Sequence, residues 1–378
     1  MKRYLFFSAQ FLPHMGGVEN YTYHLAKALI EKGNKVTVVT SMNVLGTKTY
    51  ENMDGIQVYR LSCLNLLDGR YPVLKPDGIC RKVNHILSGK QFDMVVVNTR
   101  FYLHSLYGVL FAKKHHYRCI MIEHGTGHLT LHQPVLDFLE NIFEHTITMA
   151  EKMLCREFYG VSEACLDWLG HFHIRGKGVL YNAIDLDDVE RKRKAPVCSY
   201  RDTYRIPEDA VVVTFTGRLL KEKGILTLIQ AVKNMNQNGQ NVYLLIAGDG
   251  DEEENVRQKT DEQIIALGRI RPDQVIALLD ETDIFCLPSD SEGMPTSVLE
   301  AAACKNYIVT TQRGGAKELL LNETYGLIIE DNQLETVQGA LEKALQAPDK
   351  RERAAERTYA RLRECFTWDR VAEKLMKL

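Results

Sequence analysis

The chain has 378 residues, a length that suits two domains better than one. Its 45% apolar and 25% charged residues are typical of a soluble globular protein, and no apolar run approaches the roughly 18 residues of a membrane span. The formal net charge of -2 and the lack of a concentrated basic and aromatic face argue against nucleic acid as a partner.

Cysteine usage and charge distribution suggest where the protein works. The nine cysteines are scattered without a Cys-x-x-Cys pair, which favours reduced thiols and a cytoplasmic location. Residues 1–180 hold 20 Lys+Arg against 15 Asp+Glu, whereas residues 181–378 hold 27 against 34. A basic first half suits peripheral contact with an anionic surface, such as the inner face of the cytoplasmic membrane. The sequence leaves the oligomeric state open.

The first half alternates short apolar runs with amphipathic stretches. A strand is expected at 4–8, a helix with apolar spacing at 20–32, and Gly33 ends that helix. Further strands are expected over the ranges 35–40, 57–60, 93–98, 119–123 and 158–161. Strands that alternate with helices predict a parallel sheet covered by helices on both faces.

The second half repeats this pattern. Strands are expected at 211–216, 243–247, 263–266, 284–287 and 307–310, and helices near 224–236, 252–260, 273–280 and 295–304. The fold class is therefore α/β, with two Rossmann-like, doubly wound parallel-sheet domains facing an interdomain cleft. We expect an N-terminal domain at 1–185, a polar linker at 186–208, a C-terminal domain at 209–365, and a final helix at 366–378 that packs back on the first domain.

A glycine pair follows the first expected strand. Gly16 and Gly17 lie at a strand-to-helix turn, where backbone amides are able to approach a phosphate closely. A plain turn is an equally good interpretation of this pair. The pattern is not G-x-G-x-x-G, and no acidic residue ends the second strand, which counts against a nicotinamide cofactor.

Two cations follow the first strand of the second half. Arg218 lies at the end of that strand beside Gly217, and Lys223 precedes the next helix. From these positions an Arg fork and a Lys point charge would neutralise a diphosphate. The alternative is two solvated cations on a loop.

The segment from Ser291 to Glu300 sets two carboxylates on either side of a helix start. Pro295 suits the first helical position, and the amides of Gly293, Met294 and Thr296 would face an anion. At a rise of about 1.5 Å per residue, Glu292 and Glu300 would stand roughly 10 Å apart, as the two ends of one ligand require. The alternative is an ordinary capped helix with two surface acids.

Several motifs in order resemble one large family. They include FLPHMGGVENYTYHLAKALIEKGNKVTVVT, GVSEACLDWL, VLYNAID, TGRLLKEKGILTLIQAV, LLIAGDGDEEE, ALGRI, DIFCLPSDSEGMPTSVLEAAA, GGAKEL and FTWDRVAEKL. The chain resembles the retaining glycosyltransferases of family 4 (the group 1 family), which have the GT-B fold. The resemblance extends nearly from end to end.

The resemblance implies roles for particular residues. Those implied in catalysis and in holding the departing diphosphate are His124, Arg218, Lys223 and Glu292. Those implied in donor binding are Gly16, Gly17, Arg269, Ile270, Gly293, Met294, Thr296 and Glu300. Within the second set, Glu300 would bind the ribose and the backbone around Arg269 the base. No metal and no cofactor are expected, and the metal interpretation of Asp249-Gly250-Asp251 is the minority one.

The implied reaction moves a sugar from a nucleotide-diphosphate sugar, with UDP as the expected nucleotide, to a saccharide or lipid-linked saccharide acceptor. The implied pathway is synthesis of cell-surface polysaccharide or glycolipid. The acceptor would dock on the first half, at 100–102, 113–116 and 128–132. Two alternatives stay open: a nucleotide-sugar epimerase or hydrolase on the same fold, and a non-catalytic partner subunit.

Overall fold

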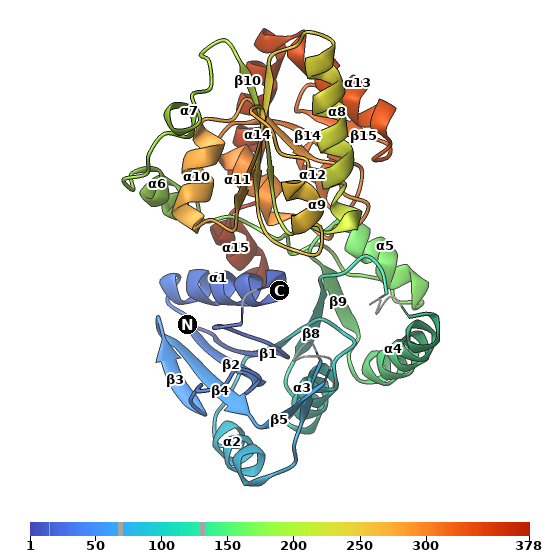
Figure 1. Cartoon of the computed structure of the whole chain (residues 1–378). Coiled ribbons are helices and arrows are strands. Elements are labelled where there is room, and N and C mark those ends of the chain that lie inside the picture. The colour runs from blue at the N-terminus through green and yellow to red at the C-terminus, as the bar shows by residue number, and fades with distance from the viewer. Residues whose placement is uncertain (15, 67–70, 129–132) are drawn as a thin grey trace. The chain divides into compact units, whose positions relative to one another are not determined.

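The computed structural model describes residues 1–14, 16–66, 71–128 and 133–378 (Figure 1). The chain forms two compact units, each described here by itself. The first comprises Met1–Asn182 and Trp368–Leu378, and the second comprises Ala183–Thr367.

The first unit is built on a sheet with strand order β3-β4-β2-β1-β7-β8-β9. Its strands are β1 (Arg3–Ser8), β2 (Lys35–Ser41), β3 (Tyr50–Met53), β4 (Ile56–Leu61), β7 (Met94–Asn98), β8 (Cys119–Glu123) and β9 (Glu157–Gly160). β3 pairs antiparallel with β4, and the other neighbours pair in parallel. Its helices are α1 (Gly17–Glu31), α2 (Gly78–Ser88), α3 (Leu103–Lys114), α4 (Pro134–Leu154), α5 (Glu163–His171) and α15 (Trp368–Lys377), and β5 (Cys63–Leu66) and β6 (Tyr71–Leu74) form a separate hairpin.

The second unit has a parallel sheet with strand order β12-β11-β10-β13-β14-β15. Its strands are β10 (Val211–Thr216), β11 (Val242–Ala247), β12 (Ile264–Gly268), β13 (Ile284–Leu287), β14 (Tyr307–Thr311) and β15 (Leu327–Ile329). Its helices are α6 (Leu186–Arg193), α7 (Tyr200–Thr203), the 3-10 turn η2 (Lys221–Lys223), α8 (Ile225–Gln237), α9 (Glu253–Arg257), α10 (Pro272–Asp280), α11 (Thr296–Ala303), α12 (Ala316–Leu319), α13 (Leu334–Leu345) and α14 (Pro348–Cys365).

Both sheets are buried as the apolar runs predict. β7 is buried along its whole length, and so is β13, because helices cover both faces of a parallel sheet. The expectation of two doubly wound α/β domains is confirmed. Three short strands were missed: β3, β5 and β6 have four residues each, too few to show a period of two.

The segment at 186–208, for which the sequence favours a linker, contains α6 and α7 and groups with the second unit. Side chains of Asp185 and Ser199 accept hydrogen bonds at the starts of these helices. The side chain of Arg193 pairs with Asp280 on α10 at 2.9 Å. Arg193, which the sequence suggests is solvated, therefore anchors the segment to the second unit.

The final helix belongs to the first unit. α15 packs along α1 (Figure 1), where the Trp368 ring meets Tyr21 at 5.3 Å between centroids. The Lys32 ammonium lies 3.1 Å from the Asp369 carboxylate. Within the described residues, no helix is both long and apolar enough to cross a membrane.

Candidate active site

The predicted donor site of the second unit lies where its strand order reverses. From β10 the chain builds outward through β11 and β12, and then returns to the other side of β10 as β13. The loops that follow β10 and β13 therefore meet at the carboxyl edge of the sheet, where doubly wound folds bind ligands. Arg218 and Lys223 lie on the first loop and Glu292 on the second.

Glycines allow the loop after β10 to pack against its neighbour backbone to backbone. Gly217 has a φ of 149°, and a Cβ on Gly248 would lie 1.8 Å from the Gly217 carbonyl oxygen. This close approach leaves no room for any other residue type at 248. Arg218 stands exposed next to it, and within the described part of the chain its guanidinium has no hydrogen bond or ion pair.

Lys223 and Glu292 form the central ion pair of this edge. The Lys223 Nζ lies 2.6 Å from Glu292 Oε1, and both side chains are largely shielded from solvent, at 17% and 11% exposed. Gly224, with a φ of 70°, allows the two loops to approach each other closely. A Cβ at this position would lie 2.2 Å from the Pro288 carbonyl oxygen. Lys223 and Glu292 are 69 residues apart along the chain, and the fold makes them direct partners.

The helix start beside this pair differs from the prediction by one residue. Pro295 is the N-cap of α11, with ψ at 123°, and not its first helical residue. The first amides of α11, including that of Thr296, have no intrahelical acceptor, and no side chain caps them. Met294 is buried below this turn. The predicted anion-facing amides follow Glu292 within four residues along the chain.

The loop holding Glu292 and Gly293 is braced from behind. The amide of Gly315 donates to the Gly293 carbonyl at 2.7 Å. Gly314 has a φ of 59°, and a Cβ there would lie 2.3 Å from the Gly293 oxygen and 2.6 Å from the Glu292 oxygen. Only glycine fits this contact, which explains why the GGAKEL motif accompanies the Glu292 loop.

Glu300 lies on α11 and is partly buried. Desolvation raises the pKa of Glu300 to about 7, with Lys192 opposing this rise and Asp188 adding to it. A carboxyl group with this pKa is a ready partner for neutral hydroxyl groups, as binding of a ribose would require.

Arg269 and Ile270 follow β12, where Gly268 turns the chain with a φ of 66°. The Arg269 side chain is exposed, and its Nη1 lies 3.7 Å from Asp249 Oδ2. Asp249 is one of the two acidic residues of Asp249-Gly250-Asp251, for which metal binding is the minority interpretation. Its carboxylate faces the Arg269 guanidinium.

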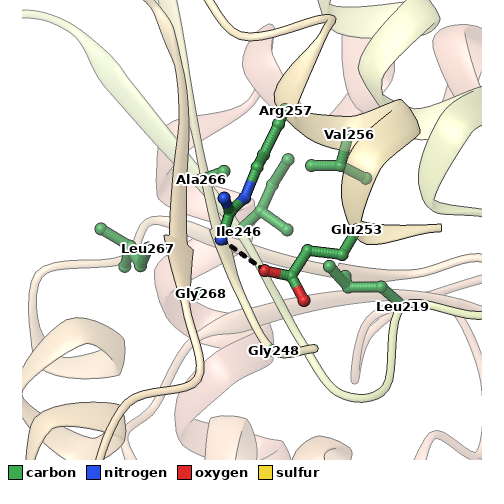
Figure 2. A pocket seen from close by; sticks show the side chains of 9 residues that line it. All are labelled: Leu219, Ile246, Gly248, Glu253, Val256, Arg257, Ala266, Leu267 and Gly268. Atoms are coloured by element: carbon green, nitrogen blue, oxygen red, sulfur yellow. Dashed lines mark hydrogen bonds and ion pairs between the residues drawn. The ribbon is translucent and has the colours of Figure 1, made fainter. Parts of the chain in front are cut away.

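A small pocket opens next to this turn. It has a volume of about 150 Å³ and lies between α9 and the carboxyl ends of β11 and β12 (Figure 2). Its lining residues are Leu219, Ile246, Gly248, Glu253, Val256, Arg257, Ala266, Leu267 and Gly268. Arg257 and Glu253 form a 2.6 Å ion pair at its side, as the dashed line in Figure 2 shows.

The predicted residues of the first unit lie at the carboxyl ends of its own strands. Gly16 is the N-cap of α1 and Gly17 its first residue. A Cβ on Gly16 would lie 2.4 Å from the Glu19 carboxylate, so a larger residue at 16 would make that side chain move. Within the first turn, Glu19 is buried and its carboxylate pairs with the His14 Nδ1 at 2.9 Å.

His124 follows β8, and its protonation state can be derived from its neighbours. Asn98 Nδ2 donates to Thr22 Oγ1 at 2.8 Å, which fixes the Asn98 amide, so its Oδ1 must accept the proton on His124 Nε2 at 3.1 Å. Desolvation lowers the pKa of His124 to about 3, so the ring is neutral. Its Nδ1 is left as a hydrogen-bond acceptor.

Arg100 was expected on an acceptor-docking surface, and that prediction is wrong. Its side chain is 1% exposed and pairs with Glu123 at 2.7 Å and with Glu144 at 2.5 Å. The backbone amides of His124 and Gly125 donate to the Glu123 carboxylate. The network therefore anchors the residue that follows β8. Residues 129–132 of the same expected surface lie outside the described residues.

The structure thus gathers part of the predicted site and leaves part separate. Most of it is at one sheet edge of the second unit: Arg218, Lys223, Arg269, Ile270, Glu292, Gly293, Met294, Thr296 and Glu300. Gly16, Gly17 and His124 are in the first unit. Sequence reasoning missed the buried Arg100–Glu144 pair, for which the only available signal was a charged residue directly after an apolar strand.

Known families match both units. A family described as Glycosyltransferase Family 4 matches residues 15–188, and one described as Glycosyl transferases group 1 matches residues 199–361. An uncharacterised glycosyltransferase of Methanocaldococcus jannaschii, MJ1069, is 23% identical and is aligned over 99% of this chain and 97% of its own length. The gpi3 subunit of the phosphatidylinositol N-acetylglucosaminyltransferase of Schizosaccharomyces pombe is 24% identical over 97% of this chain and 78% of its own.

Solved structures share the fold over the full chain. Sucrose-phosphate synthase of Thermosynechococcus elongatus has a TM-score of 0.76 at 16% identity and covers 100% of this chain, with 98% of its own chain matched. Anabaena Alr3699/HepE, solved with UDP, has a TM-score of 0.74 at 17% identity, with 100% and 99% covered. The chain has the GT-B fold, belongs to the family 4 (group 1) glycosyltransferases, and is a glycosyltransferase.

Proposed function

We propose that this glycosyltransferase moves a sugar from a nucleotide-diphosphate sugar, with UDP as the nucleotide, to a lipid-linked or saccharide acceptor with retention of configuration. The observation that carries the proposal is the sheet edge of the second unit. There the Lys223–Glu292 pair, at 2.6 Å, lies beside the uncapped start of α11, and Arg218 stands exposed on the adjoining loop.

The chemical demand of this reaction is stabilisation of the leaving diphosphate. Arg218 supplies a fork of donors, Lys223 a point charge, and the first amides of α11 further donors to an anion. Preorganised groups of this kind usually supply the largest share of catalysis. Because two cations serve the diphosphate, we propose that the reaction needs no metal ion and no cofactor.

We propose that the sugar is positioned by Glu292 and His124. The Lys223 ammonium orients Glu292 through their ion pair, so that the Glu292 carboxylate accepts hydrogen bonds from sugar hydroxyls. His124 is neutral, which suits a hydrogen bond to a sugar hydroxyl at its Nδ1 and not proton donation. A phosphate oxygen of the donor would then take the proton of the acceptor, with attack on the face that the nucleotide leaves.

The choice of UDP and of the subsites rests on two kinds of support. Anabaena Alr3699/HepE, a protein of the same fold, was solved with UDP and with UDP-glucose. In this chain we assign the base to the turn at Arg269 and Ile270, beside the pocket of Figure 2, and the ribose to Glu300. We assign the phosphate contacts of the first unit to Gly16 and Gly17.

A lipid-linked acceptor is supported by the unusual polarity of α4. This helix buries Glu144, Thr148 and Glu151 and exposes apolar side chains, the reverse of an ordinary amphipathic helix. Its exposed apolar residues include Val135, Leu136, Phe138, Leu139, Ile142, Phe143, Met149 and Met153. An apolar surface of this extent usually meets another apolar phase.

Neighbouring elements extend this surface. The Tyr71 ring of β6 meets Phe143 at 5.8 Å, and the adjoining β5 exposes Leu64 and Leu66. On α3, which packs beside α4, the exposed Leu110 precedes Lys113 and Lys114 by three and four residues, which places apolar and basic groups on one face. We propose that this surface rests on an anionic membrane, on the cytoplasmic side, where the acceptor resides.

Turnover of separate variants tests the donor site. We expect Arg218→Ala and Lys223→Ala each to lower turnover of a UDP-sugar with acceptor by more than tenfold, because leaving-group stabilisation is lost. Lys343→Ala is the matched control, since that lysine has only an exposed ion pair with Glu323. Wild-type rates in both test variants would contradict the proposal. Release of UDP or an altered sugar at full rate without acceptor would instead indicate a hydrolase or epimerase.

Vesicle binding tests the membrane surface independently of turnover. We expect Phe138→Asp and Ile142→Asp to weaken flotation with phosphatidylglycerol vesicles by at least tenfold, whereas Leu45→Asp, at a fully exposed leucine elsewhere, leaves it unchanged. No binding of the wild-type protein to anionic vesicles at low salt would remove the membrane part of the proposal.

A further inference from the structure

Three histidines from separate segments of the first unit converge beside α4. His128 follows β8 along the chain, His145 lies in α4 and His171 ends α5. Their ring centroids lie 5.1 to 5.7 Å apart. His145 and His171 are exposed and His128 is partly buried, so solvent reaches the cluster. None of these residues belongs to the donor site proposed above.

The spacing of the ring nitrogens matches that of metal ligands. Nε2 of His145 lies 3.3 Å from Nε2 of His171. Two imidazole nitrogens bound to Zn²⁺ at about 2.0–2.1 Å with tetrahedral angles lie about 3.3–3.4 Å apart. A ring nitrogen of His128 lies within 4.8 Å of both, so a small rotation of its ring closes a triangle of three donors. We propose that His128, His145 and His171 bind Zn²⁺ or a similar divalent transition metal, with water as the fourth ligand.

The surroundings orient the ligands as a metal site requires. Glu144 Oε2 lies 2.6 Å from Nδ1 of His128, which fixes the proton on Nδ1 and leaves Nε2 for a metal. A carboxylate behind a ligating histidine is the usual outer partner in zinc sites. Glu144 is itself held by the buried Arg100. The indole of Trp168 stacks on His171 at 4.8 Å and 6° between planes, which fixes the direction of that ring.

A second group of candidate ligands, in which ligand atoms of His128, Glu140 and Glu144 lie within 4.8 Å of one another, is less suited to a metal. Its Glu144 carboxylate is already paired with the Arg100 guanidinium at 2.5 Å.

The site would fasten the segment that carries His124. Residues 125–128 lead directly from His124 to His128, and the metal would tie His128 to α4 and α5. Its role is therefore structural or regulatory: it holds the residue after β8 in place and supplies no chemistry to the sugar transfer.

Metal binding by untagged, chelator-treated protein tests this inference without any activity assay. We expect isothermal titration with Zn²⁺ to give one site per chain, and Co²⁺ to give the absorption bands of a tetrahedral complex. The double variant His145→Ala with His171→Ala should bind Zn²⁺ at least tenfold more weakly. His85→Ala, at an exposed histidine of α2, should bind as the wild type does.

Thermal unfolding shows whether the double variant is folded. Because both substituted histidines are exposed, its melting temperature without metal should match that of the wild type, and Zn²⁺ should raise the melting temperature of the wild type alone. If the folded double variant binds Zn²⁺ as tightly as the wild type, or if the wild type binds none, the metal site is refuted and the 3.3 Å contact is a hydrogen bond between two rings.

Discussion

The two units of this glycosyltransferase use the same sheet plan but fix the ends of their strands by different means. In the second unit, glycines at 217, 224, 248 and 314 allow loop backbones to touch, and the functional side chains stand on this framework. In the first unit, a buried guanidinium at Arg100 ties Glu123 and Glu144 together behind the loop that carries His124. The sheet edge that carries Arg218, Lys223 and Glu292 thus depends on backbone contacts, and the corresponding region of the first unit depends on buried charge.

This contrast predicts that the largest stability loss comes from breaking the charged network. Arg100→Met leaves the carboxylates of Glu123 and Glu144 buried without their cation, so we expect a loss of about 3–5 kcal/mol in the free energy of unfolding. Both tryptophans, Trp168 and Trp368, belong to the first unit, so their fluorescence in urea reports this loss specifically.

Arg118→Met is the control for this prediction. Its ion pair with Glu157 is largely exposed, and such pairs contribute about 0–1 kcal/mol. Equal losses for Arg100→Met and Arg118→Met would show that the buried network has no special part in the first unit.

The second unit should respond most strongly to a methyl group on its backbone framework. Gly314→Ala forces a left-handed φ on alanine and places its Cβ 2.3 Å from the Gly293 carbonyl oxygen. We expect a loss of about 3 kcal/mol in stability, the upper range for local backbone strain, and weaker donor binding because the Glu292 loop must shift.

Gly339→Ala is the matched control in the same unit. This glycine lies in α13, and a Cβ there would meet nothing within 4 Å, so alanine should stabilise by about 1 kcal/mol. Thermal unfolding followed by circular dichroism measures both variants. A neutral effect of Gly314→Ala would contradict the claim that backbone contacts shape the donor edge.

A smaller and pH-dependent effect is expected from His104, a fully buried histidine of α3. Desolvation lowers the pKa of His104 to about 4, below the value of about 6.5 in the unfolded chain. Between these values the unfolded state binds the extra proton, so stability falls as the pH falls. From pH 7 to pH 5 we expect a contribution of about 2 kcal/mol to be lost.

Urea unfolding of His104→Gln, followed by tryptophan fluorescence, tests this sign. The glutamine variant should lose less stability than the wild type between pH 7 and pH 5, and His85→Gln should behave as the wild type.

Glu300, in the second unit, has the opposite effect on the pH dependence of stability. Because its pKa is raised to about 7, the native state binds the extra proton and stability falls as the pH rises from about 4.5 to 7.

The sequence was sufficient for the fold because the buried strands follow from local signals. Buried runs such as 211–216 and 284–287 form the strands that they predict, and the positions after them place Arg218 and Glu292 at the sheet edge. The boundary at Pro295 was wrong by one residue, since its ψ of 123° is extended and not helical. A proline permits either position.

What the sequence did not reveal depends on contacts between distant segments. Arg100 and Glu144 are separated by a helix and a strand, and no local pattern shows that they are paired and buried. The same holds for α4, where Glu144 and Glu151 are buried although charged residues usually lie on the surface. Arg100 offsets the cost of burying Glu144, because a buried carboxylate needs a paired cation.

Titration with UDP tests the central claim most directly. The wild-type protein should bind UDP at one site per chain, and Arg218→Ala and Lys223→Ala should each weaken binding at least tenfold, whereas Lys343→Ala leaves it unchanged. If the wild type binds no UDP, or if both variants bind it as tightly as the wild type does, the edge formed by Arg218, Lys223 and Glu292 is not the donor site.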